Sequence, residues 1–470
     1  MTKIESAPTF NFIKKIFLVS ADKKRKDRVK IYFKDKYNKK EAFLMKTVAL
    51  VGLGARGLNT YAPYAKLHPD KMKVVAVADV IKERVQMAAE EYSVPQDMCF
   101  DSAESFFKRE KLADAVFIST QDRQHVGHAL MALERGYDIL LEKPISNDIE
   151  ECYALKRKVD ESQKLVLVCH VLRYTTFYKT IKDAIDSKII GDVVSVQAIE
   201  NVGYWHMAHS FVRGNWRNSE STSPMILQKC CHDFDIYGWL IGKKCIGVSS
   251  FGSLSHFRAE NAPEGASDRC VSCKHVDSCI YSAKKIYLDS PLNGFKSGNT
   301  DWPVNVVMAN PTESGLMQAL KTSDYGRCVY ACDNNVVDHQ VCNVLFEDGV
   351  TLNFTMCGFT EEMSRHCKIM GTKGEIVADQ NSNIVTVKPF GGEPKVYDIN
   401  VLATDLSGHG GGDNAMLTEF FGCLCDESVD ASSTIANSVQ SHEIAVACEQ
   451  SRILGGAYVS LEQLRKQANK

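Results

Sequence analysis

The sequence lacks long apolar runs. No stretch of its 470 residues approaches the roughly 18–20 consecutive apolar residues that a membrane-spanning helix needs. No segment near the start combines an uninterrupted apolar core with the small-residue cleavage site of a secretory signal. Internal repeats and low-complexity tracts are also missing, which excludes collagen-like and disordered classes. With 44% hydrophobic residues, we expect two or three globular domains and no membrane partner.

Cysteine is absent from the first part of the chain, since none precedes Cys99, although the total is 17. Most of these cysteines stand singly or inside apolar runs, as buried thiols do. Without a secretory signal, this usage predicts free thiols in a reducing cytoplasm rather than a disulfide framework.

The sequence as a whole lacks a strong net charge, because its 56 Lys and Arg residues nearly balance its 58 Asp and Glu residues. This balance argues against nucleic acid as a partner. It conceals a basic segment: residues 1–44 carry 13 basic and 5 acidic side chains, and the remainder carries a net charge of −10. We expect residues 1–44 to be a poorly ordered basic extension and the folded body to begin near Met45.

Hydrophobic patterning divides this body into two parts. Over residues 45–170, short β-branched runs alternate with helical segments, which predicts a doubly wound parallel sheet. Over residues 171–470 most runs are short and several end in turn residues such as Glu347-Asp-Gly349. The second part is therefore expected to contain a mostly antiparallel sheet, and the chain to be of the α/β class.

Two helical regions are predicted in the second part. One begins with Ser223 as N-cap and Pro224 at the first helical position, continues to Leu240, and is followed by Gly242. The other comprises the C-terminal helices within residues 414–466.

A glycine-rich segment follows the first predicted strand. It reads Gly52-Leu-Gly54-Ala55-Arg56-Gly57 and opens a helical segment. Asp79 stands 22 residues beyond Gly57, at the end of the next predicted strand. This is the context of a Rossmann dinucleotide site, in which the glycines allow a close backbone approach, the helix N-terminus faces the pyrophosphate, and the carboxylate binds the ribose hydroxyls.

Asp79 also bears on the choice between NAD and NADP. Its negative charge would repel a 2′-phosphate, so the sequence favours NAD as the cofactor. Arg56 and Lys82 are close enough along the sequence to reach a phosphate, and they keep NADP open as the alternative.

Glu142-Lys143-Pro144 ends the predicted strand Tyr137–Leu141. A lysine here points into the crevice outside the carboxyl ends of the strands, where ligands bind in such sheets. An ammonium group beside a nicotinamide ring is able to hold a substrate hydroxyl and relay its proton. We therefore treat Lys143 as a candidate catalytic residue, although a lone lysine at a strand end is more often a solvated one.

Taken together, these motifs resemble the glucose–fructose oxidoreductase / inositol dehydrogenase / MocA family. The resemblance extends over roughly residues 46–460 and includes further short motifs: Thr120-Gln-Asp-Arg-Gln-His125, Gly136, Arg173-Tyr174, Ile190-Gly191 and Gly408-His-Gly-Gly-Gly-Asp413. It implies a Rossmann domain followed by an α/β domain with a large, open, mixed sheet. It also implies NAD(P)-dependent oxidation of sugars, cyclitols or related polyols by a homodimer or homotetramer.

The resemblance assigns roles to residues of this chain. Thr120 and His125 would lie along the cofactor, Glu142 would orient the nicotinamide end, and Lys143 would be the catalytic lysine. Arg173 and Tyr174 would belong to the substrate site.

A second catalytic element is expected on the first helix of the second domain. The family pattern is Asp-x-x-x-His, with Tyr as the alternative to His, and here Gln228 and His232 occupy the two positions. His232 suits a general acid or base, because an imidazole titrates near neutrality. Gln228 departs from the family carboxylate but is expected, like His232, to contact the substrate. Lys229 is the residue that we expect to substitute for the carboxylate as a cationic catalytic or substrate contact.

Cysteines gather in an apparent insertion at residues 256–327. Cys270, Cys273 and Cys279 have the local spacing of a structural zinc knuckle, which needs four ligands. The candidates for the fourth ligand are Cys328, Cys332, His275 and His256. The alternative is a set of reduced cysteines packed beneath a long excursion. After the insertion, Asp338 and His339 are weaker candidates for the substrate site, with turn and strand-edge roles as the alternative.

The sequence thus predicts an NAD-dependent oxidoreductase that acts on a sugar, cyclitol or other polyol. Two alternatives use the same residues. One is a glycosidase that uses bound NAD for transient oxidation, elimination and re-reduction, and the other is a non-catalytic NAD-binding regulatory protein.

Overall fold

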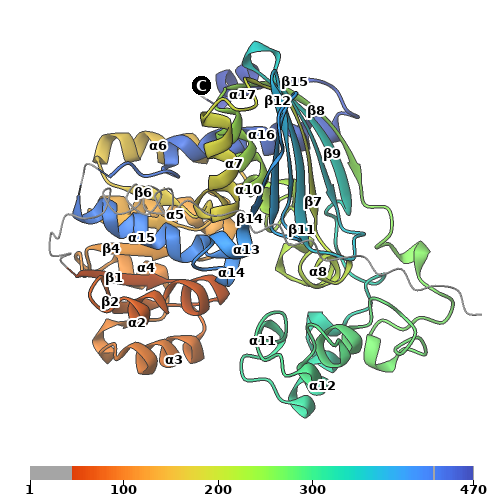
Figure 1. Cartoon of the computed structure of the whole chain (residues 1–470). Helices are drawn as coiled ribbons and strands as arrows, with labels where there is room; N and C mark the ends of the chain where they lie inside the picture. Colours follow the sequence, from red (N-terminus) through yellow and green to blue (C-terminus); the bar gives the residue numbers. More distant parts are fainter. Residues whose placement is uncertain (1–44, 427–428, 469–470) are drawn as a thin grey trace, which may run out of the picture. The chain divides into compact units, whose positions relative to one another are not determined.

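The structure is a computed structural model that describes residues 45–426 and 429–468 (Figure 1). The predicted basic extension, residues 1–44, lies outside the described residues. Within these two ranges, no helix is long and apolar enough to cross a membrane.

The first part of the described chain forms a six-stranded sheet in which all strands run parallel. The strands are β1 (Lys46–Val51), β2 (Met72–Ala78), β3 (Cys99–Phe100), β4 (Ala115–Ile118), β5 (Asp138–Leu141) and β6 (Val166–Val168). Their order is β3-β2-β1-β4-β5-β6, that of the dinucleotide-binding doubly wound fold. β4 is buried along its whole length, as in a parallel sheet covered on both faces. The predicted Rossmann fold is confirmed.

Helices cover this sheet, and one of them comes from the far end of the chain. Those from the first part are the π-helix η1 (Ala55–Tyr61), α2 (Tyr64–Leu67), α3 (Lys82–Tyr92), α4 (Ala103–Phe107), α5 (His125–Glu134) and α6 (Ile149–Ser162). α15 (Gly412–Cys425) lies alongside the sheet in Figure 1. Its buried Phe420 packs against Phe117 of β4, with ring centroids 5.7 Å apart. A segment distant in the sequence therefore completes a layer of the first sheet.

The second sheet has nine strands in the order β14-β13-β12-β11-β7-β10-β9-β8-β15. They are β7 (Val193–Asn201), β8 (Cys245–Ser253), β9 (His339–Phe346), β10 (Thr351–Cys357), β11 (Ser364–Gly371), β12 (Gly374–Asp379), β13 (Ile384–Pro389), β14 (Lys395–Asp398) and β15 (Val459–Ser460). β7 and β10 pair in parallel, with Val196 opposite Leu352. The other neighbouring pairs of described strands are antiparallel. The predicted mixed, mostly antiparallel sheet is confirmed.

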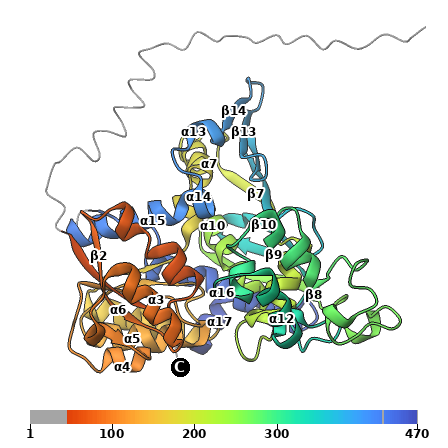
Figure 2. The ribbon, with the colours of Figure 1, turned by 90° about the horizontal axis from the view of Figure 1, so that it is seen from below.

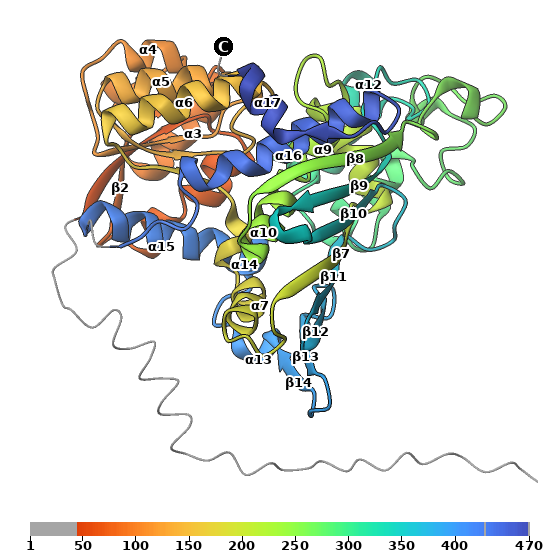
Figure 3. The same cartoon turned by 90° about the horizontal axis from the view of Figure 1, so that it is seen from above.

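Helices pack on one face of this second sheet (Figure 3). They include α7 (Thr176–Asp186), α10 (Cys231–Ile241) and α16 (Ile435–Ile453). Alternate residues of β10, among them Leu352, Phe354 and Met356, are buried beneath them. The other short helical segments include η3 (Asp122–Gln124), η4 (Val171–Tyr174), α8 (Tyr204–His206), η5 (Met207–Arg213), η6 (Asn215–Arg217), α13 (Ile399–Leu402), α14 (Ser407–Gly410) and α17 (Leu461–Ala468).

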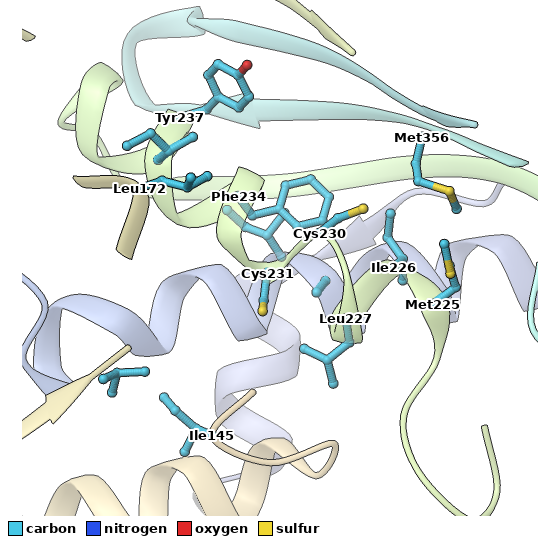
Figure 4. Packing of buried hydrophobic residues seen from close by; sticks show 14 of the residues in the cluster. Ile145, Leu172, Met225, Ile226, Leu227, Cys230, Cys231, Phe234, Tyr237 and Met356 are labelled. Atoms are coloured by element: carbon cyan, nitrogen blue, oxygen red, sulfur yellow. The ribbon is translucent and has the colours of Figure 1, made fainter. Parts of the chain in front are cut away.

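The apolar core of the second sheet continues to the first domain. Figure 4 shows Leu227 of α9 (Met225–Gln228) and Cys231 of α10 between Met356 of the sheet and Ile145 of the first domain. These four side chains belong to one buried cluster. This packing fixes the loop that follows β5 relative to α9 and α10, and it is the basis of the candidate site described below.

The helix predicted after Ser223 is interrupted. α9 follows Pro224 and ends at Gln228, and α10 starts again at Cys231. Ser223 does not act as the predicted N-cap, because its Oγ instead donates a hydrogen bond of 2.9 Å to Asp122 Oδ2 of the first domain. The predicted C-terminal glycine is confirmed, since Gly242 follows the helix with a φ of 68°.

Residues 256–327 lie in the connection between β8 and β9, which are hydrogen-bonded neighbours (Figure 2). This insertion contains η7 (Ala259–Asn261), η8 (Cys270–Ser272), the π-helix η9 (Lys285–Asp289), η10 (Phe295–Ser297), α11 (Val304–Val307), α12 (Glu313–Thr322) and η11 (Asp324–Gly326). Arg213 anchors it from η5. Its fully buried guanidinium donates hydrogen bonds of 2.7 Å to the backbone oxygens of Arg327 and Tyr281.

Candidate active site

The glycine turn after β1 has one crowded side and one open side. Gly52 has a φ of 91°, and a Cβ there would lie 2.5 Å from the backbone oxygen of Ser119. A Cβ on Gly57 would lie 2.0 Å from the oxygen of Gly52. By contrast, a Cβ on Gly54 would meet no described atom closer than Arg84 Nη1, at 4.0 Å. Gly52 and Gly57 are therefore required by the turn itself, whereas Gly54 leaves backbone accessible at the start of η1.

Asp79 stands at the edge of this open space, after β2. Its Oδ2 accepts a hydrogen bond of 2.6 Å from the Leu53 amide, and its Oδ1 accepts one of 2.8 Å from the Ile81 amide. These bonds hold the carboxylate beside the glycine turn. The open backbone at Gly54 and the adjacent carboxylate fit the pyrophosphate and ribose of a dinucleotide.

Arg84 is a neighbour of this carboxylate that sequence reasoning missed. Its Nη1 lies 3.9 Å from Asp79 Oδ2, and its side chain is partly exposed. The signal that could have found it is its position in α3, the helix that follows Asp79. A cation at this place bears on the choice between NAD and NADP, as Arg56 and Lys82 do in the sequence argument.

Arg56 makes different contacts from those that its position in the fingerprint predicts. Its Nε lies 2.6 Å from Glu142 Oε1, and its Nη2 lies 2.6 Å from Asp413 Oδ1 of α15. Tyr61 joins the group, because its hydroxyl accepts from Arg56 and donates to Glu142. The guanidinium thus ties the glycine turn to the loop after β5 and to α15, and its engagement with two carboxylates leaves it poorly suited to a phosphate.

The two carboxylates of this network are ionised. Burial acts to raise the pKa of Glu142, but the opposing effects of Arg56 and Lys143 outweigh it and the pKa is lowered. The same balance, with Arg56 and His409 as the opposing groups, holds the pKa of Asp413 far below its ordinary value. The cations beside each carboxylate, rather than exposure to water, keep the negative charges in place.

Lys143 is held at both ends by hydrogen bonds. Its amide donates to Glu142 Oε2 at 2.9 Å, and its Nζ donates to the backbone oxygen of Gln228 at 2.8 Å. The next residues are fixed as well, since the Ile145 amide donates to His442 Nε2 at 2.8 Å. The structure thereby brings the predicted catalytic lysine against the end of α9, in the second domain.

Thr120 and His125 brace this loop from the first domain. His125 is buried, and its Nδ1 and Nε2 lie 2.7 Å and 3.1 Å from the backbone oxygens of Pro144 and Thr120. The Thr120 hydroxyl lies 3.0 Å from His128 Nδ1. The His125 ring therefore contacts the loop that carries Lys143, whereas the Thr120 hydroxyl contacts His128 instead.

His232 lies on α10, four residues after Gln228. Its ring makes no hydrogen bond to a described residue, and its Nδ1 is buried. Burial lowers its pKa well below the ordinary value, and the positive charge of Lys143 lowers it further. The imidazole is therefore neutral at physiological pH, and the same shift makes it a weaker proton acceptor than the imidazole titrating near neutrality that the sequence argument assumed.

Further histidines surround His232 and were missed from the sequence. The rings of His170 and His409 lie 5.8 Å and 6.2 Å from that of His232, and the ring of His442 lies 5.9 Å from that of His170. They come from three separate segments of the chain. His409 belongs to the Gly408–Asp413 motif, which was noted in the sequence only as part of the resemblance, and its Nδ1 lies 2.9 Å from Asp413 Oδ2.

Lys229 is paired with a buried carboxylate. Its Nζ lies 2.9 Å from Glu200 Oε1 of β7, and Arg365 Nε lies 2.8 Å from both Glu200 Oε2 and Asp233 Oδ1. This arrangement gives the ammonium group a structural partner and places it next to Gln228. Burial raises the pKa of Asp233, while Arg365 opposes the shift and Glu200 adds to it.

Arg173 and Tyr174 are buried rather than turned to a ligand. All three guanidinium nitrogens of Arg173 donate hydrogen bonds to protein oxygens, two of them to Asp235 at 2.6 and 2.7 Å. The Tyr174 hydroxyl donates to Glu419 and contacts the Ser433 hydroxyl. The structure therefore gives both predicted substrate-site residues a packing role between η4, α10 and the C-terminal helices.

The cysteines of the insertion do not form the predicted zinc site. Cys270, Cys273, Cys279 and Cys328 do line one cavity, of about 20 Å³, but the fully buried Arg213 lines it as well and donates to Cys270 Sγ at 3.4 Å. A fixed guanidinium opposes a second cation there. Within residues 45–426 and 429–468, no three or more Cys, His, Asp or Glu side chains are arranged to hold a metal ion. The alternative, free thiols packed within the insertion, fits these contacts.

The other candidates for the metal or substrate site also have protein partners. Cys332 Sγ contacts the Cys328 oxygen at 3.2 Å, and the rings of His275 and His256 contact Glu264 and Tyr330. Asp338 is fully buried and accepts from the Ser255 and His256 amides at 2.8 Å, with His339 Nδ1 also at 2.8 Å. Asp338 thus anchors the start of the insertion.

Comparison with known proteins agrees with this architecture. A family model described as "Oxidoreductase family, NAD-binding Rossmann fold" matches residues 46–170, and one described as "Oxidoreductase family, C-terminal alpha/beta domain" matches residues 182–461. The chain belongs to the glucose–fructose oxidoreductase / inositol dehydrogenase / MocA family. It is accordingly an NAD(P)-dependent oxidoreductase.

Members of the family with assigned names differ in how much of this chain they match. The putative oxidoreductase YteT of Bacillus subtilis is 21% identical over 80% of this chain and 89% of that protein. An inositol 2-dehydrogenase of Gluconacetobacter diazotrophicus is 25% identical over 36% of this chain. The matched region covers 47% of that enzyme. The WlbA dehydrogenase of Bordetella pertussis, solved with NADH and UDP-GlcNAcA, superposes with a TM-score of 0.63 at 16% identity, covering 88% of this chain and 97% of that one. At that identity the likeness shows the fold.

Proposed function

We propose that the protein oxidises a hydroxyl group of a sugar, cyclitol or other polyol with NAD as the hydride acceptor, and that Lys143 and His232 are the catalytic pair. The observation that carries the proposal is the meeting of two domains at Gln228. The first domain contributes an ammonium group bound to the Gln228 oxygen, and the second contributes, four residues later on α10, a neutral imidazole on which the charge of Lys143 acts.

The chemistry divides between these two side chains. The Lys143 ammonium has further N–H groups with which to hold the substrate hydroxyl and to stabilise negative charge on its oxygen. His232, neutral because it is buried and close to cations, accepts the hydroxyl proton. Bound NAD supplies the acceptor for the hydride that leaves the same carbon. Glu142, itself fixed by Arg56, orients the amide of Lys143 and with it the loop.

NAD is proposed over NADP because Asp79 borders the open turn. Its carboxylate suits the ribose hydroxyls and repels a 2′-phosphate, whereas the partly exposed Arg84, 3.9 Å from it, is the group that favours NADP. Titration of the protein with each cofactor decides between them. We expect NAD to bind more tightly, and a variant Asp79→Ala to narrow or reverse the difference.

The substrate class rests on the names of relatives. An inositol 2-dehydrogenase and a dehydrogenase solved with a sugar nucleotide are among the proteins that this chain resembles. The neutral imidazole of His232 and the ammonium group of Lys143 suit a hydroxyl group. They do not by themselves determine which sugar binds. A panel of aldoses, cyclitols and glycosides with NAD is therefore the first experiment, with NADH absorbance as the signal.

The catalytic assignment is tested with Lys143→Met. We expect turnover to fall roughly 10²- to 10⁴-fold, the usual contribution of a positioned acid or base, while NAD binding persists. Lys188→Met is the matched control, because that lysine is 67% exposed and pairs with Asp192 at the surface. Unchanged turnover in Lys143→Met would sink the assignment.

The same panel separates the alternatives. Hydrolysis of a chromogenic glycoside without net NADH formation would identify the glycosidase that uses bound NAD. Binding of NAD with no turnover of any compound would identify a regulatory protein. Retention of both Lys143 and His232 favours an enzyme over that second alternative.

A further inference from the structure

The insertion contacts α8 and η5 of the second domain, the segments that follow β7. α8 follows β7, which carries Glu200, the partner of Lys229 at 2.9 Å. Lys229 is adjacent in sequence to Gln228, whose oxygen holds Lys143 Nζ. The segment after β7 therefore begins within a few residues of the groups that position the reacting lysine.

Aromatic rings from α8 and from the insertion meet at this place. Trp302 of the insertion has its ring centroid 4.9 Å from that of Trp205 and 5.0 Å from that of His206. It also lies 5.4 Å from His209 of η5. Trp205, His206 and Trp302 are all half-buried, so each presents part of its surface to the outside. We call these three residues the aromatic wall.

Charge interactions link His206 of the wall to Lys229 and Lys143. Burial lowers the pKa of His206 well below its ordinary value, and the positive charges of Lys229 and Lys143 act in the same direction. The imidazole is thus neutral. The wall consists of two indoles and an uncharged ring, a surface suited to the flat, apolar face of a ring rather than to an ionic group.

Nearby cations are already engaged, which bears on the type of ligand. Lys229 and Arg365 pair with Glu200 and Asp233, and Arg213 donates to backbone oxygens. A diphosphate bound at the wall would have to compete with these partners. A glycosyl ring, with its apolar C–H face and neutral hydroxyls, needs no such competition.

We propose that the aromatic wall is a subsite for the second sugar ring of a glycosidic substrate, with Trp302 as the specificity-determining residue brought by the insertion. The inference rests on the proposed function, because the first ring is the one oxidised at Lys143 and His232. A free monosaccharide occupies only the reacting position. A disaccharide gains the wall as well.

The test compares a monosaccharide with the corresponding disaccharide, using Trp302→Leu and Trp302→Phe. Leucine fills much of the volume without a π face, and phenylalanine keeps a ring. We expect Trp302→Leu to lower kcat/KM for the disaccharide roughly 3- to 10-fold, the equivalent of one ring-stacking contact, with the monosaccharide changed less than about twofold. Trp302→Phe should recover most of the loss. Trp239→Phe, on α10 beside Lys182, is the matched tryptophan control.

Binding measured without turnover separates the wall from the proposed reaction. Calorimetric titration of the NAD-loaded protein with the disaccharide should show the same loss of affinity in Trp302→Leu. If the wild-type protein binds the disaccharide but oxidises nothing, the proposed function is refuted and the proposed sugar subsite at the aromatic wall is retained. Four outcomes would refute the proposed subsite. They are an equal effect of Trp302→Leu on both sugars, no effect on either sugar, no binding of the disaccharide, and a loss of affinity confined to a sugar nucleotide. Each variant is first matched to wild type in NAD affinity and thermal unfolding.

Discussion

The two faces of the glycine turn predict opposite outcomes for one added methyl group. In Gly52→Ala, the new Cβ would lie 2.5 Å from the Ser119 oxygen, on a backbone with a φ of 91°. In Gly54→Ala, the nearest described atom is Arg84 Nη1 at 4.0 Å, and the backbone is extended, with a φ of −77°. Gly52→Ala should therefore impair folding, whereas Gly54→Ala should impair cofactor binding.

The magnitudes follow from these distances. A non-glycine residue in the left-handed region costs roughly 1–2 kcal/mol, and overpacking against fixed backbone adds about 1–3 kcal/mol. Gly52→Ala should thus lower the free energy of unfolding by about 2–5 kcal/mol. Gly54→Ala should leave that free energy unchanged to within about 0.5 kcal/mol. Its methyl group would keep an anion from the backbone, and losing one charged hydrogen bond worth roughly 1.5–3 kcal/mol weakens binding about 10- to 150-fold.

Two assays read these quantities separately. Urea unfolding without cofactor gives the free energy of unfolding, and calorimetric titration gives NAD affinity. Gly127→Ala is the matched control, because Gly127 is an exposed position of α5 where a Cβ meets no described atom within 4 Å. Wild-type NAD affinity in Gly54→Ala would refute the placement of the pyrophosphate at this turn. A large loss of stability in Gly54→Ala would refute the distinction between the two faces.

Two further predictions follow from buried groups and a third from an exposed sheet face. Burial and Lys143 lower the pKa of His232, so its neutral form persists on acidification. We therefore expect kcat/KM to stay level through the ordinary histidine range near pH 6.5 and to decline only in more acid solution. A decline of kcat/KM with a midpoint near pH 6.5 would contradict the lowered pKa. Arg173→Met leaves Asp235 buried without its bidentate partner and should lower the free energy of unfolding in urea by about 3–5 kcal/mol. Lys188→Met, an exposed control paired with Asp192, should change it by less than about 0.5 kcal/mol. The open sheet exposes apolar side chains such as Ile199, Phe251 and Val377, and we expect a homodimer or homotetramer by light scattering, with a monomer as the opposing result.

Local sequence patterns were sufficient for the fold and for the cofactor domain. Alternating strands and helices, and glycines spaced with Asp79 at the next strand end, depend on residues close together in the chain, so the Rossmann sheet and the mixed sheet were both predictable. Roles assigned to Lys143 and His232 stay predictions that the geometry supports. The neighbouring residues His170 and His442 carry no local pattern that marks them as part of a site, and His409 was noted only within the Gly408–Asp413 motif.

Long-range contacts decided what the sequence alone had left open or misassigned. Ser223 was expected to cap a helix, but its hydroxyl donates a hydrogen bond to the carboxylate of Asp122, 101 residues away in the sequence. The cysteine spacing suggested zinc, and only the fold brings the buried Arg213 into the same lining. Arg56 lies in the fingerprint, but its partner Asp413 is 357 residues distant. The sequence by itself determined the family, the two sheets and the cofactor turn, because these depend on short-range periodicity and spacing. The tertiary structure decided which charges are paired, which rings meet and which side chains remain available, because those depend on segments that only folding brings together.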